Sequence, residues 1–334
     1  MNKIEESMKP MNTISKYDTI KIKVHIGVHW FIFSRYILAK TLNVIKICEK
    51  DCNRIAYELK KKLVIGQYFD VDLNEFQSIL FELMNDFGYK EVYKEKYLMM
   101  YKFNSNRFPF IILIAGTKCI GKSTIANYLS ERLNISNVLQ TKIVSIVMSN
   151  INEKYDLVDK FQSESVEENL KSYFEQSSLI RKGCNLDMLK AYKEGKPVIL
   201  EGHHIIPNQF ITNDENLNCT IKLNMPILKD ENKHDKDIRN EINSLNSKGL
   251  IIPFLLTIKE NSHLKYFSKS KSKDKLSIFE TFREIQKFLL KNNDENNRNF
   301  IVFDVSDKSE IDIIDEMNTI VLNKIEEFIN SLKN

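Results

Sequence analysis

The stretch FPFIILIAGTKCIGKST, residues 108–124, is the most informative part of this 334-residue chain. It opens with an apolar run as long as a β-strand and then matches the pattern G-x-x-x-x-G-K-[ST] from Gly116 to Ser123. An apolar, helix-prone segment follows at residues 125–133. A strand, a loop and a helix in this order are the context in which the pattern indicates a phosphate-binding loop (P-loop). We therefore predict a nucleotide site here rather than an ordinary glycine turn.

The residue types of this loop suit a bound chain of phosphates. Backbone N–H groups surround the anion, the following helix points its positive end at it, and glycine lets the backbone come close. Lys122 is expected to reach the β- and γ-phosphates, and the Ser123 hydroxyl is expected to ligate Mg²⁺. The predicted ATP-binding residues are Gly116, Thr117, Lys118, Cys119, Ile120, Gly121, Lys122, Ser123 and Thr124.

The composition sets limits on the class of protein. A hydrophobic content of 43% is sufficient for a core, and the length allows two domains. A net charge of +4 is only mildly basic and does not by itself indicate a nucleic-acid partner. Five scattered cysteines predict reduced thiols in a cytosol-like compartment. No signal peptide is visible and no apolar run approaches ~18 residues, so we expect a soluble, cytoplasmic protein without a membrane partner.

The region before the loop has its own pattern. Residues 1–18 are polar and unpatterned and are predicted to be a flexible tail. Residues 20–26 alternate apolar and polar side chains, which indicates a half-buried strand. Residues 19–104 are therefore predicted to form a small, mostly helical domain, with residues 102–107 as the linker to the next domain. Its four helices are expected near residues 34–42, 50–63, 74–86 and 89–101, with a capping box at residues 72–75 before the third.

From the loop onward, strands and helices alternate, so residues 108–334 are predicted to form an α/β domain. Such alternation implies a parallel sheet with helices on both faces and ligands at the carboxyl ends of the strands. Residues 213–247 are rich in Asn, Asp, Glu and Lys and are predicted to be a polar surface insertion. The further strands are expected at residues 137–140, 196–201, 250–258 and 300–303, and the helices at 141–148, 167–194 with a break at Gly183, 277–291 and after the cap at 307–310.

Two later features bear on chemistry. The strand predicted at 196–201 ends in Glu201, where P-loop enzymes often carry the acid that orients Mg²⁺ or positions the attacking group. A plain surface glutamate is the alternative. Residues 266–275 are basic and polar, and they fit either a solvated loop or a lid that closes over phosphates. We predict Lys122 and Glu201 as catalytic residues, and Ser123 and Glu201 as metal ligands.

Several motifs together resemble the archaeal-type 2-phosphoglycerate kinases. FSRYILAKTL, residues 33–42, resembles the first helix of the N-terminal ATP-cone-like domain of that family, and residues 115–126 resemble its P-loop. GKPVILEGHHIIP, residues 195–207, resembles its second motif, in which Glu-Gly-x-His follows a strand. Residues 254–258 and 282–286 resemble the two stretches that flank its lid. The resemblance implies an α/β P-loop kinase fold preceded by an ATP-cone-like domain.

The resemblance also implies an activity, the transfer of the ATP γ-phosphoryl group to the free hydroxyl of 2-phosphoglycerate. It places His204 at the substrate cleft and brings Arg283 within reach of a phosphate; a structural histidine and a surface ion pair remain the alternatives. Two departures from the family pattern matter. Lys142 stands where the family has an acid, and it is predicted to bind an acceptor phosphate instead. The lid is Arg-rich in the family, whereas this chain offers lysines, which lack the bidentate fork of arginine, at 269, 271, 273 and 275.

We therefore predict ATP-dependent phosphotransfer to a small phosphorylated metabolite, with ATP and Mg²⁺ as cofactors. A catalytically weak nucleotide-binding protein with a regulatory or scaffold role is the alternative, because Lys142 replaces the acid. Nucleic acid is not expected, because no interleaved aromatic platform accompanies the lysines. The residues leave open the acceptor, the ligand of the N-terminal domain and whether the chain forms a homo-oligomer.

Overall fold

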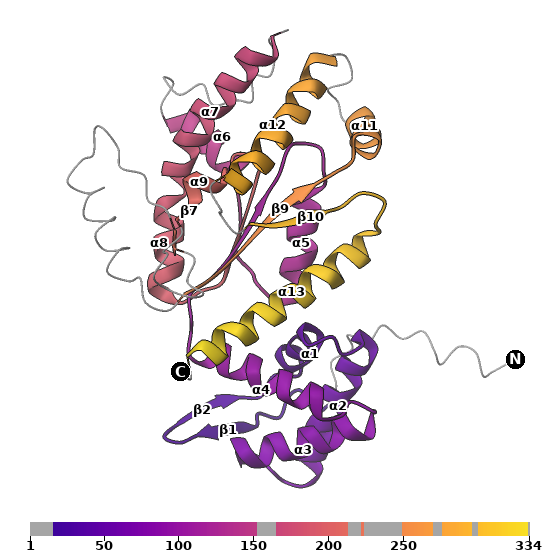
Figure 1. Ribbon diagram of the computed structural model, residues 1–334. Helices are drawn as coiled ribbons and strands as arrows, with labels where there is room; N and C mark the ends of the chain where they lie inside the picture. Colours follow the sequence, from indigo (N-terminus) through magenta and orange to yellow (C-terminus); the bar gives the residue numbers. More distant parts are fainter. Residues whose placement is uncertain are drawn as a thin grey trace, which may run out of the picture. The chain divides into compact units, whose positions relative to one another are not determined.

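The computed structural model describes residues 16–151, 165–212, 222–223, 249–269, 276–295 and 300–332. The chain divides into two compact units, one made of Met1–Lys102 with Arg132–Asn134 and the other of Phe103–Glu131 with Ile135–Asn334 (Figure 1). Three predicted features lie wholly or largely outside the described residues: the tail before residue 16, the insertion at 213–247, and the lid lysines beyond residue 269. Among the described helices, none has both the length and the apolar content needed to cross a bilayer.

The first unit is helical with a small sheet. Its helices α1 (Arg35–Val44), α2 (Glu49–Ile65), α3 (Leu73–Asp86) and most of α4 (Glu91–Ser105) match the four predicted stretches. The Asp72 side chain accepts a hydrogen bond from the Asn74 amide at 3.0 Å and so caps α3, as predicted. Whether this unit is ATP-cone-like remains a prediction.

One sequence expectation in this unit was wrong, and the predicted linker is partly helical. The sheet has three strands in the order β2-β1-β3, whereas one strand was predicted: β1 (Lys23–Ile26), β2 (His29–Ile32) and β3 (Asp70–Asp72). All four residues of β2 are exposed, so this strand carries no alternation of buried and exposed positions. Residues 102–105, the first part of the predicted linker, continue α4, and the boundary between the two units falls after Lys102, inside that linker.

The second unit is built on a five-stranded parallel sheet. Its strands are β4 (Phe110–Ala115), β5 (Val138–Gln140), β6 (Val198–Glu201), β9 (Leu250–Thr257) and β10 (Ile301–Asp304), and their order is β10-β9-β4-β6-β5. All four pairings are parallel, and β4 lies in the middle with all six residues buried. Long apolar runs are typical of strands that are covered on both faces, so the α/β prediction for this unit is confirmed.

Helices fill the connections between these strands. They are α5 (Lys122–Leu133), α6 (Thr141–Ile151), α7 (Val166–Gly183), α8 (Asn185–Glu194), α9 (Pro207–Phe210), α11 (Glu260–Lys269), α12 (Leu276–Glu295) and α13 (Glu310–Ser331). The predicted break at Gly183 separates α7 from α8. The helix α11 was not predicted, since the basic run at 266–275 read as loop or lid. A short antiparallel pair, β7 (Ile211–Thr212) and β8 (Lys222–Leu223), was also missed.

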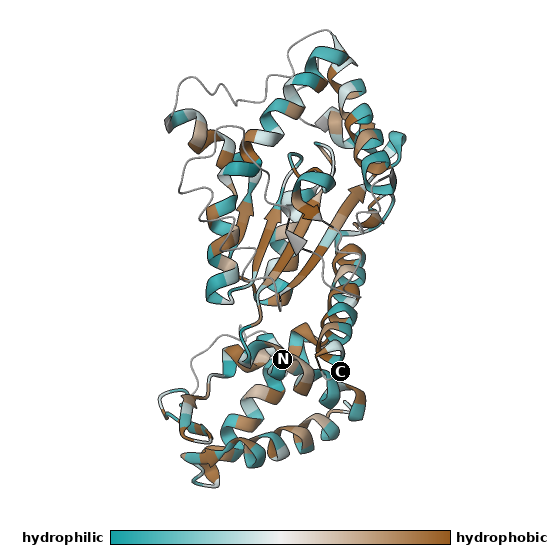
Figure 2. Ribbon diagram, turned by 60° about the vertical axis from the view of Figure 1, so that its left-hand side comes forward, coloured by the Kyte–Doolittle hydropathy of each residue, from teal (hydrophilic) through white to brown (hydrophobic). Residues whose placement is uncertain are grey.

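The hydrophobic core of the second unit lies on both faces of β4. Ile111 and Leu113 belong to one large cluster with apolar side chains of α7, α8 and α12. Ile112 and Ile114 point to the opposite face, because side chains alternate along a strand, and they are also fully buried. Figure 2 shows the strands as continuous hydrophobic ribbons flanked by helices that carry apolar residues on one side. Each fully buried Ile or Leu contributes roughly 1.5–3 kcal/mol, so this sheet is a rigid base for its loops.

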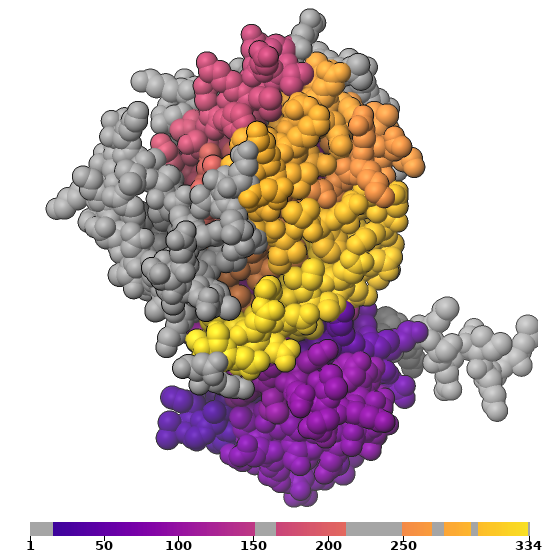
Figure 3. Space-filling model, in the orientation of Figure 1, coloured from indigo at the N-terminus to yellow at the C-terminus, as the bar shows by residue number. Residues whose placement is uncertain are grey.

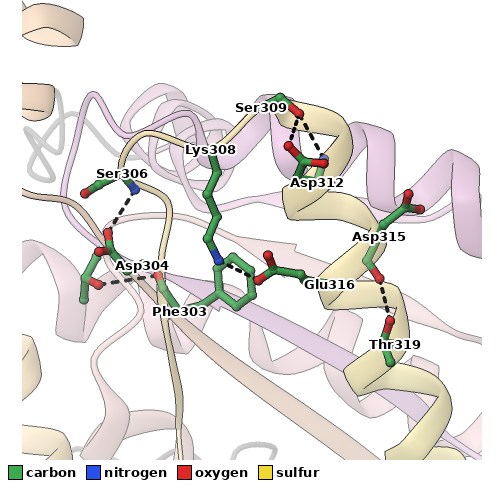
Figure 4. A network of polar contacts seen from close by, with 10 residues as sticks. Phe303, Asp304, Ser306, Lys308, Ser309, Asp312, Asp315, Glu316 and Thr319 are labelled. Atoms are coloured by element: carbon green, nitrogen blue, oxygen red, sulfur yellow. Dashed lines mark hydrogen bonds and ion pairs between the residues drawn. The ribbon is translucent and has the colours of Figure 1, made fainter.

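The last helix of the second unit, α13, begins with a side-chain cap. The Ser309 hydroxyl accepts a hydrogen bond from the Asp312 amide and donates to the Asp312 carboxylate, so Ser309 is the N-cap of α13 (Figure 4). The helix begins where it was predicted, but its cap pairs Ser309 with Asp312 and not Asp307 with Glu310. Next to it, Lys308 lies over the Phe303 ring and pairs with Glu316. Figure 3 shows residues of α12 and α13 on one face of this unit.

Candidate functional site

The candidate site begins at the carboxyl end of β4, where residues 116–121 join this strand to α5. The neighbours of β4 are β6 on one side and β9 on the other, so the chain connections diverge at this strand. In open α/β sheets such a switch point is where ligands bind. A Cβ at Gly116 would lie 2.7 Å from the Leu256 carbonyl oxygen, so only glycine fits between the loop and β9.

Two side chains at the start of α5 define the floor of the site. Lys122 is 7% exposed, and its amine donates a hydrogen bond of 2.6 Å to the Thr117 carbonyl oxygen. The Ser123 hydroxyl donates to Glu201 Oε1 at 2.8 Å. Glu201 ends β6 and is paired in register with Ile114 of β4, so the sheet itself places the carboxylate beside the loop.

The end of β6 also approaches the start of α6 closely. A Cβ at Gly202 would lie 1.7 Å from the Thr141 hydroxyl oxygen and 2.7 Å from its β-carbon. Thr141 is fully buried and its hydroxyl lies 3.1 Å from His204 Nδ1. The glycine after Glu201 therefore allows β6 and α6 to meet directly below the site.

A cavity of about 410 Å³ opens over these residues. Three cations and one anion contribute to its wall, which gives it a positive balance suited to a polyanionic ligand. Its apolar side comes from α12. The lining residues are Lys118, Cys119, Lys122, Ser123, Thr141, Lys142, Glu201, Gly202, His203, Ile278 and Phe282.

The structure brings some of the sequence-predicted residues together and leaves others outside. Lys122, Ser123, Lys142 and Glu201 all line the cavity. His204 is fully buried against Thr141 and is not among the lining residues.

Arg283 does not line the cavity either, and its guanidinium donates to the Ile258 carbonyl oxygen at 2.9 Å. Neither this position nor that of His204 tests the predicted role of the residue, and both roles remain predictions.

Sequence reasoning missed several lining residues. His203 lines the cavity, its carbonyl oxygen accepts a 2.8 Å hydrogen bond from the Tyr173 hydroxyl, and its ring stacks on Tyr173. Burial raises the pKa of Tyr173, so its hydroxyl stays neutral and able to donate. The Glu-Gly-His-His run held a signal for an imidazole here, but it could not show which of the two rings faces the cavity. No signal in the sequence connected Phe282 of α12 with the loop.

The donor atoms present fit a magnesium nucleotide. Mg²⁺ prefers oxygen ligands and usually retains waters, with one or two protein oxygens and the phosphates completing its shell. The Ser123 hydroxyl and the Glu201 carboxylate are two such oxygens. In the part of the chain that the structure describes, no cluster of three or more His, Cys, Asp or Glu side chains could hold a metal on its own. The two oxygens of Ser123 and Glu201 suit a metal whose other ligands are water and phosphate oxygens.

Comparisons with known proteins find similarity to kinases. A family model described as "AAA domain" matches residues 112–244. The 2-phosphoglycerate kinase of Pyrococcus horikoshii is 28% identical over 186 residues, which are 52% of this chain and 62% of that protein. The enzyme of the same name from Methanopyrus kandleri is 26% identical over 52% of this chain and 56% of its own length. The chain therefore spans less than two thirds of the length of these relatives.

Among solved structures, a shikimate kinase from Acinetobacter baumannii in complex with shikimate is similar, at 11% identity and a TM-score of 0.39. The similarity covers 66% of this chain and 97% of that one. The P-loop after the central strand, the parallel sheet around it and the curated relatives together support a 2-phosphoglycerate kinase-like P-loop kinase.

Proposed function

We propose that this protein transfers the γ-phosphoryl group of ATP to a hydroxyl of a small phosphorylated metabolite, with 2-phosphoglycerate as the first acceptor to test. The observation that carries the proposal is the pairing of Ser123 with Glu201 at 2.8 Å in a cavity that Lys122 and Lys142 also line. These side chains could bind a phosphate chain, a metal ion and an anionic acceptor in one cavity. The names of the curated relatives support the choice of acceptor.

On the donor side, the chain contributes position and charge. The loop amides would surround the β-phosphate, and the Lys122 amine would exchange the Thr117 carbonyl for phosphate oxygens. Mg²⁺, when bound, would neutralise charge on the β- and γ-phosphates. Ser123 and Glu201 would hold it, directly or through water.

On the acceptor side, the single lysine of α6 that reaches the cavity is the key group. Lys142 lies in the first turn of α6 and is solvent-exposed, so its ammonium can pair with a phosphate or carboxylate of the acceptor. An ammonium group has three N–H donors and no lone pair, so it cannot accept the hydroxyl proton. Glu201, only 4% exposed, is the carboxylate available to orient or deprotonate that hydroxyl.

The test is ADP release by the full chain with Mg-ATP and a panel of phosphorylated hydroxy acids that includes 2-phosphoglycerate. Glu201→Gln keeps the shape of the side chain and removes its charge and basicity, and it should lower kcat by the ~10²–10⁴-fold typical of a lost general base. Equal turnover by wild type and Glu201→Gln would rule out the role proposed for this carboxylate. No ADP release with any acceptor would rule out the kinase itself.

The second candidate function is nucleotide binding without transfer, in a regulatory or scaffold role. The specific observation in its favour is Lys142, a cation where the relatives' pattern has an acid. Calorimetry with Mg-ATP separates the two candidates, because this second function predicts binding by the wild-type chain with no turnover. Under it, Lys142→Asp would not reduce any activity and could introduce one.

A further inference from the structure

His263 lies outside the cavity but contacts the loop that forms it. It belongs to α11, is fully buried, and its Nε2 atom is 2.9 Å from the Lys118 carbonyl oxygen. Its ring packs against Phe279 and Phe282 of α12, with centroids 5.1 and 6.4 Å away. This imidazole therefore joins the two helices on either side of residues 270–275 to the phosphate-binding loop.

The hydrogen bond fixes the form of the imidazole. A carbonyl oxygen can only accept, so Nε2 must carry the hydrogen. The other ring nitrogen, Nδ1, is buried and has no hydrogen-bond partner among the residues that the structure describes. Burial lowers the pKa of His263, and the nearby positive charges of Arg283 and Lys122 act in the same direction. The ring is thus neutral, with hydrogen on Nε2 and a lone pair on Nδ1.

The geometry of the peptide links this bond to ligand binding. The peptide between Lys118 and Cys119 is planar and trans, so the Cys119 N–H points away from the Lys118 carbonyl, and hence away from His263. Lys118 and Cys119 line the cavity, whereas His263 does not. Cys119 also has φ +58°, a backbone conformation that residues with a side chain rarely adopt. Such a loop conformation persists only when its surroundings hold it.

A second contact holds the preceding residue of the same loop. The Thr117 hydroxyl donates to the Phe282 carbonyl oxygen of α12 at 2.8 Å. Thr117 and Lys118 are therefore each fixed from the same pair of helices, one through its side chain and the other through its carbonyl oxygen.

We propose that His263 is a positioning residue for nucleotide binding: its bond to the Lys118 carbonyl keeps the 118–119 peptide turned so that the Cys119 N–H faces the bound phosphates. The inference rests on the proposed function, since it assumes that the loop holds ATP. His263 touches no reacting atom, and its effect passes through the loop.

The test uses two replacements at His263 in the full chain. His263→Phe keeps a ring in the aromatic packing but has no donor, whereas His263→Gln keeps an N–H donor at about the position of Nε2. Loss of a buried hydrogen bond corresponds to about a tenfold change in affinity. We expect His263→Phe to weaken Mg-ATP binding in calorimetry by about tenfold, and His263→Gln to restore most of that loss.

The matched control is Ser262→Ala on the same helix. Its hydroxyl donates to Asp307 at 3.0 Å, so the variant also loses a partly buried hydrogen bond, but one that does not reach the loop. We expect this control to lower the melting temperature while leaving the affinity for Mg-ATP at the wild-type value. A destabilised helix alone therefore cannot imitate the expected result.

A second measurement does not depend on nucleotide binding. Long-range ¹H–¹⁵N spectra of the histidine rings distinguish the two neutral tautomers, and the His263 signals are identified by their loss in His263→Gln. We expect the Nε2–H form near neutral pH. An Nδ1–H form would overturn the inference, as would wild-type ATP affinity in His263→Phe or an equal loss in both replacements. Failure of the wild-type chain to bind Mg-ATP would instead overturn the proposed function, and the tautomer would still decide whether the contact exists.

Discussion

The two sides of the cavity are built in different ways. The side proposed to bind ATP (the donor side) is one continuous stretch, in which β4, the loop and the first turn of α5 follow each other within residues 110–123. The side proposed to bind the acceptor (the acceptor side) is assembled from the end of β6, the start of α6 and one face of α12, which are far apart in the sequence. A continuous motif constrains its own geometry, whereas a wall assembled from separate elements can change one residue at a time.

The largest effect is expected on the donor side. Lys122→Ala removes a charge-assisted hydrogen bond worth roughly 1.5–3 kcal/mol in ATP binding. The loss in the transfer step should be larger, because the lysine also stabilises charge that develops on the phosphoryl group in the transition state. Calorimetry with Mg-ATP and ADP-release kinetics measure the two parts. Equal ATP affinity for wild type and Lys122→Ala would mean that the loop is not the nucleotide site.

The next prediction concerns the close contact between the end of β6 and the start of α6. Gly202→Ala places a Cβ 1.7 Å from the Thr141 hydroxyl and 2.7 Å from its β-carbon, so α6 or the end of β6 must shift. Overpacking of this kind costs about 1–3 kcal/mol, and we also expect weaker acceptor binding because Lys142 moves with α6. Urea unfolding gives the free energy.

The control for this substitution is Gly88→Ala. Gly88 has φ +88° but nothing within 4 Å of an added Cβ, so its loss reports backbone strain without a clash. If Gly202→Ala were no more destabilising than this control and left acceptor binding unchanged, the close approach of β6 and α6 would have no bearing on the site.

The contrast between continuous and assembled regions also explains which parts of the fold could be predicted from the sequence. Strands such as β4, β6 and β9 are short apolar runs between turn or helix signals, so each could be located alone. The strand β2 could not, because its four residues are all exposed and carry no periodic pattern.

In the site, the positions of Lys122 and Ser123 follow from the motif, and that of Glu201 follows from the end of a strand. The sequence could not choose between His203 and His204, because the chain after β6 is irregular and lacks a fixed side-chain period. It also could not bring Phe282 to the loop, since that contact depends on how α12 packs across the whole domain.

A smaller effect is expected at Lys142. Lys142→Ala removes a solvent-exposed cation from the acceptor side and leaves the loop intact. We expect the KM for the acceptor to rise by about tenfold, as for one lost charged hydrogen bond, with kcat and ATP affinity changed much less. Lys142→Arg is the matched control, because it keeps the charge. A fall in kcat at an unchanged acceptor KM would show that Lys142 acts in the transfer step and not in acceptor binding.

The smallest expected effect is a pH dependence of the folding stability that is caused by His263, which contacts the loop from outside the cavity. The pKa of His263 is lowered by burial and, secondarily, by the positive charges of Arg283 and Lys122, while its hydrogen bond to Lys118 opposes the shift. Between this lowered value and the ~6.5 of an unfolded chain, the unfolded state binds more protons than the folded state, so stability rises with pH across that window and falls on acidification. One group contributes at most about 1.4 kcal/mol per pH unit. Urea unfolding of wild type and His263→Gln from pH 5 to 8 isolates this term, because other titrating groups cancel in the difference. The stability of wild type relative to His263→Gln should therefore decrease as the pH falls below about 6.5; a difference that stays constant, or grows in acid, would show that His263 is not held neutral against the loop.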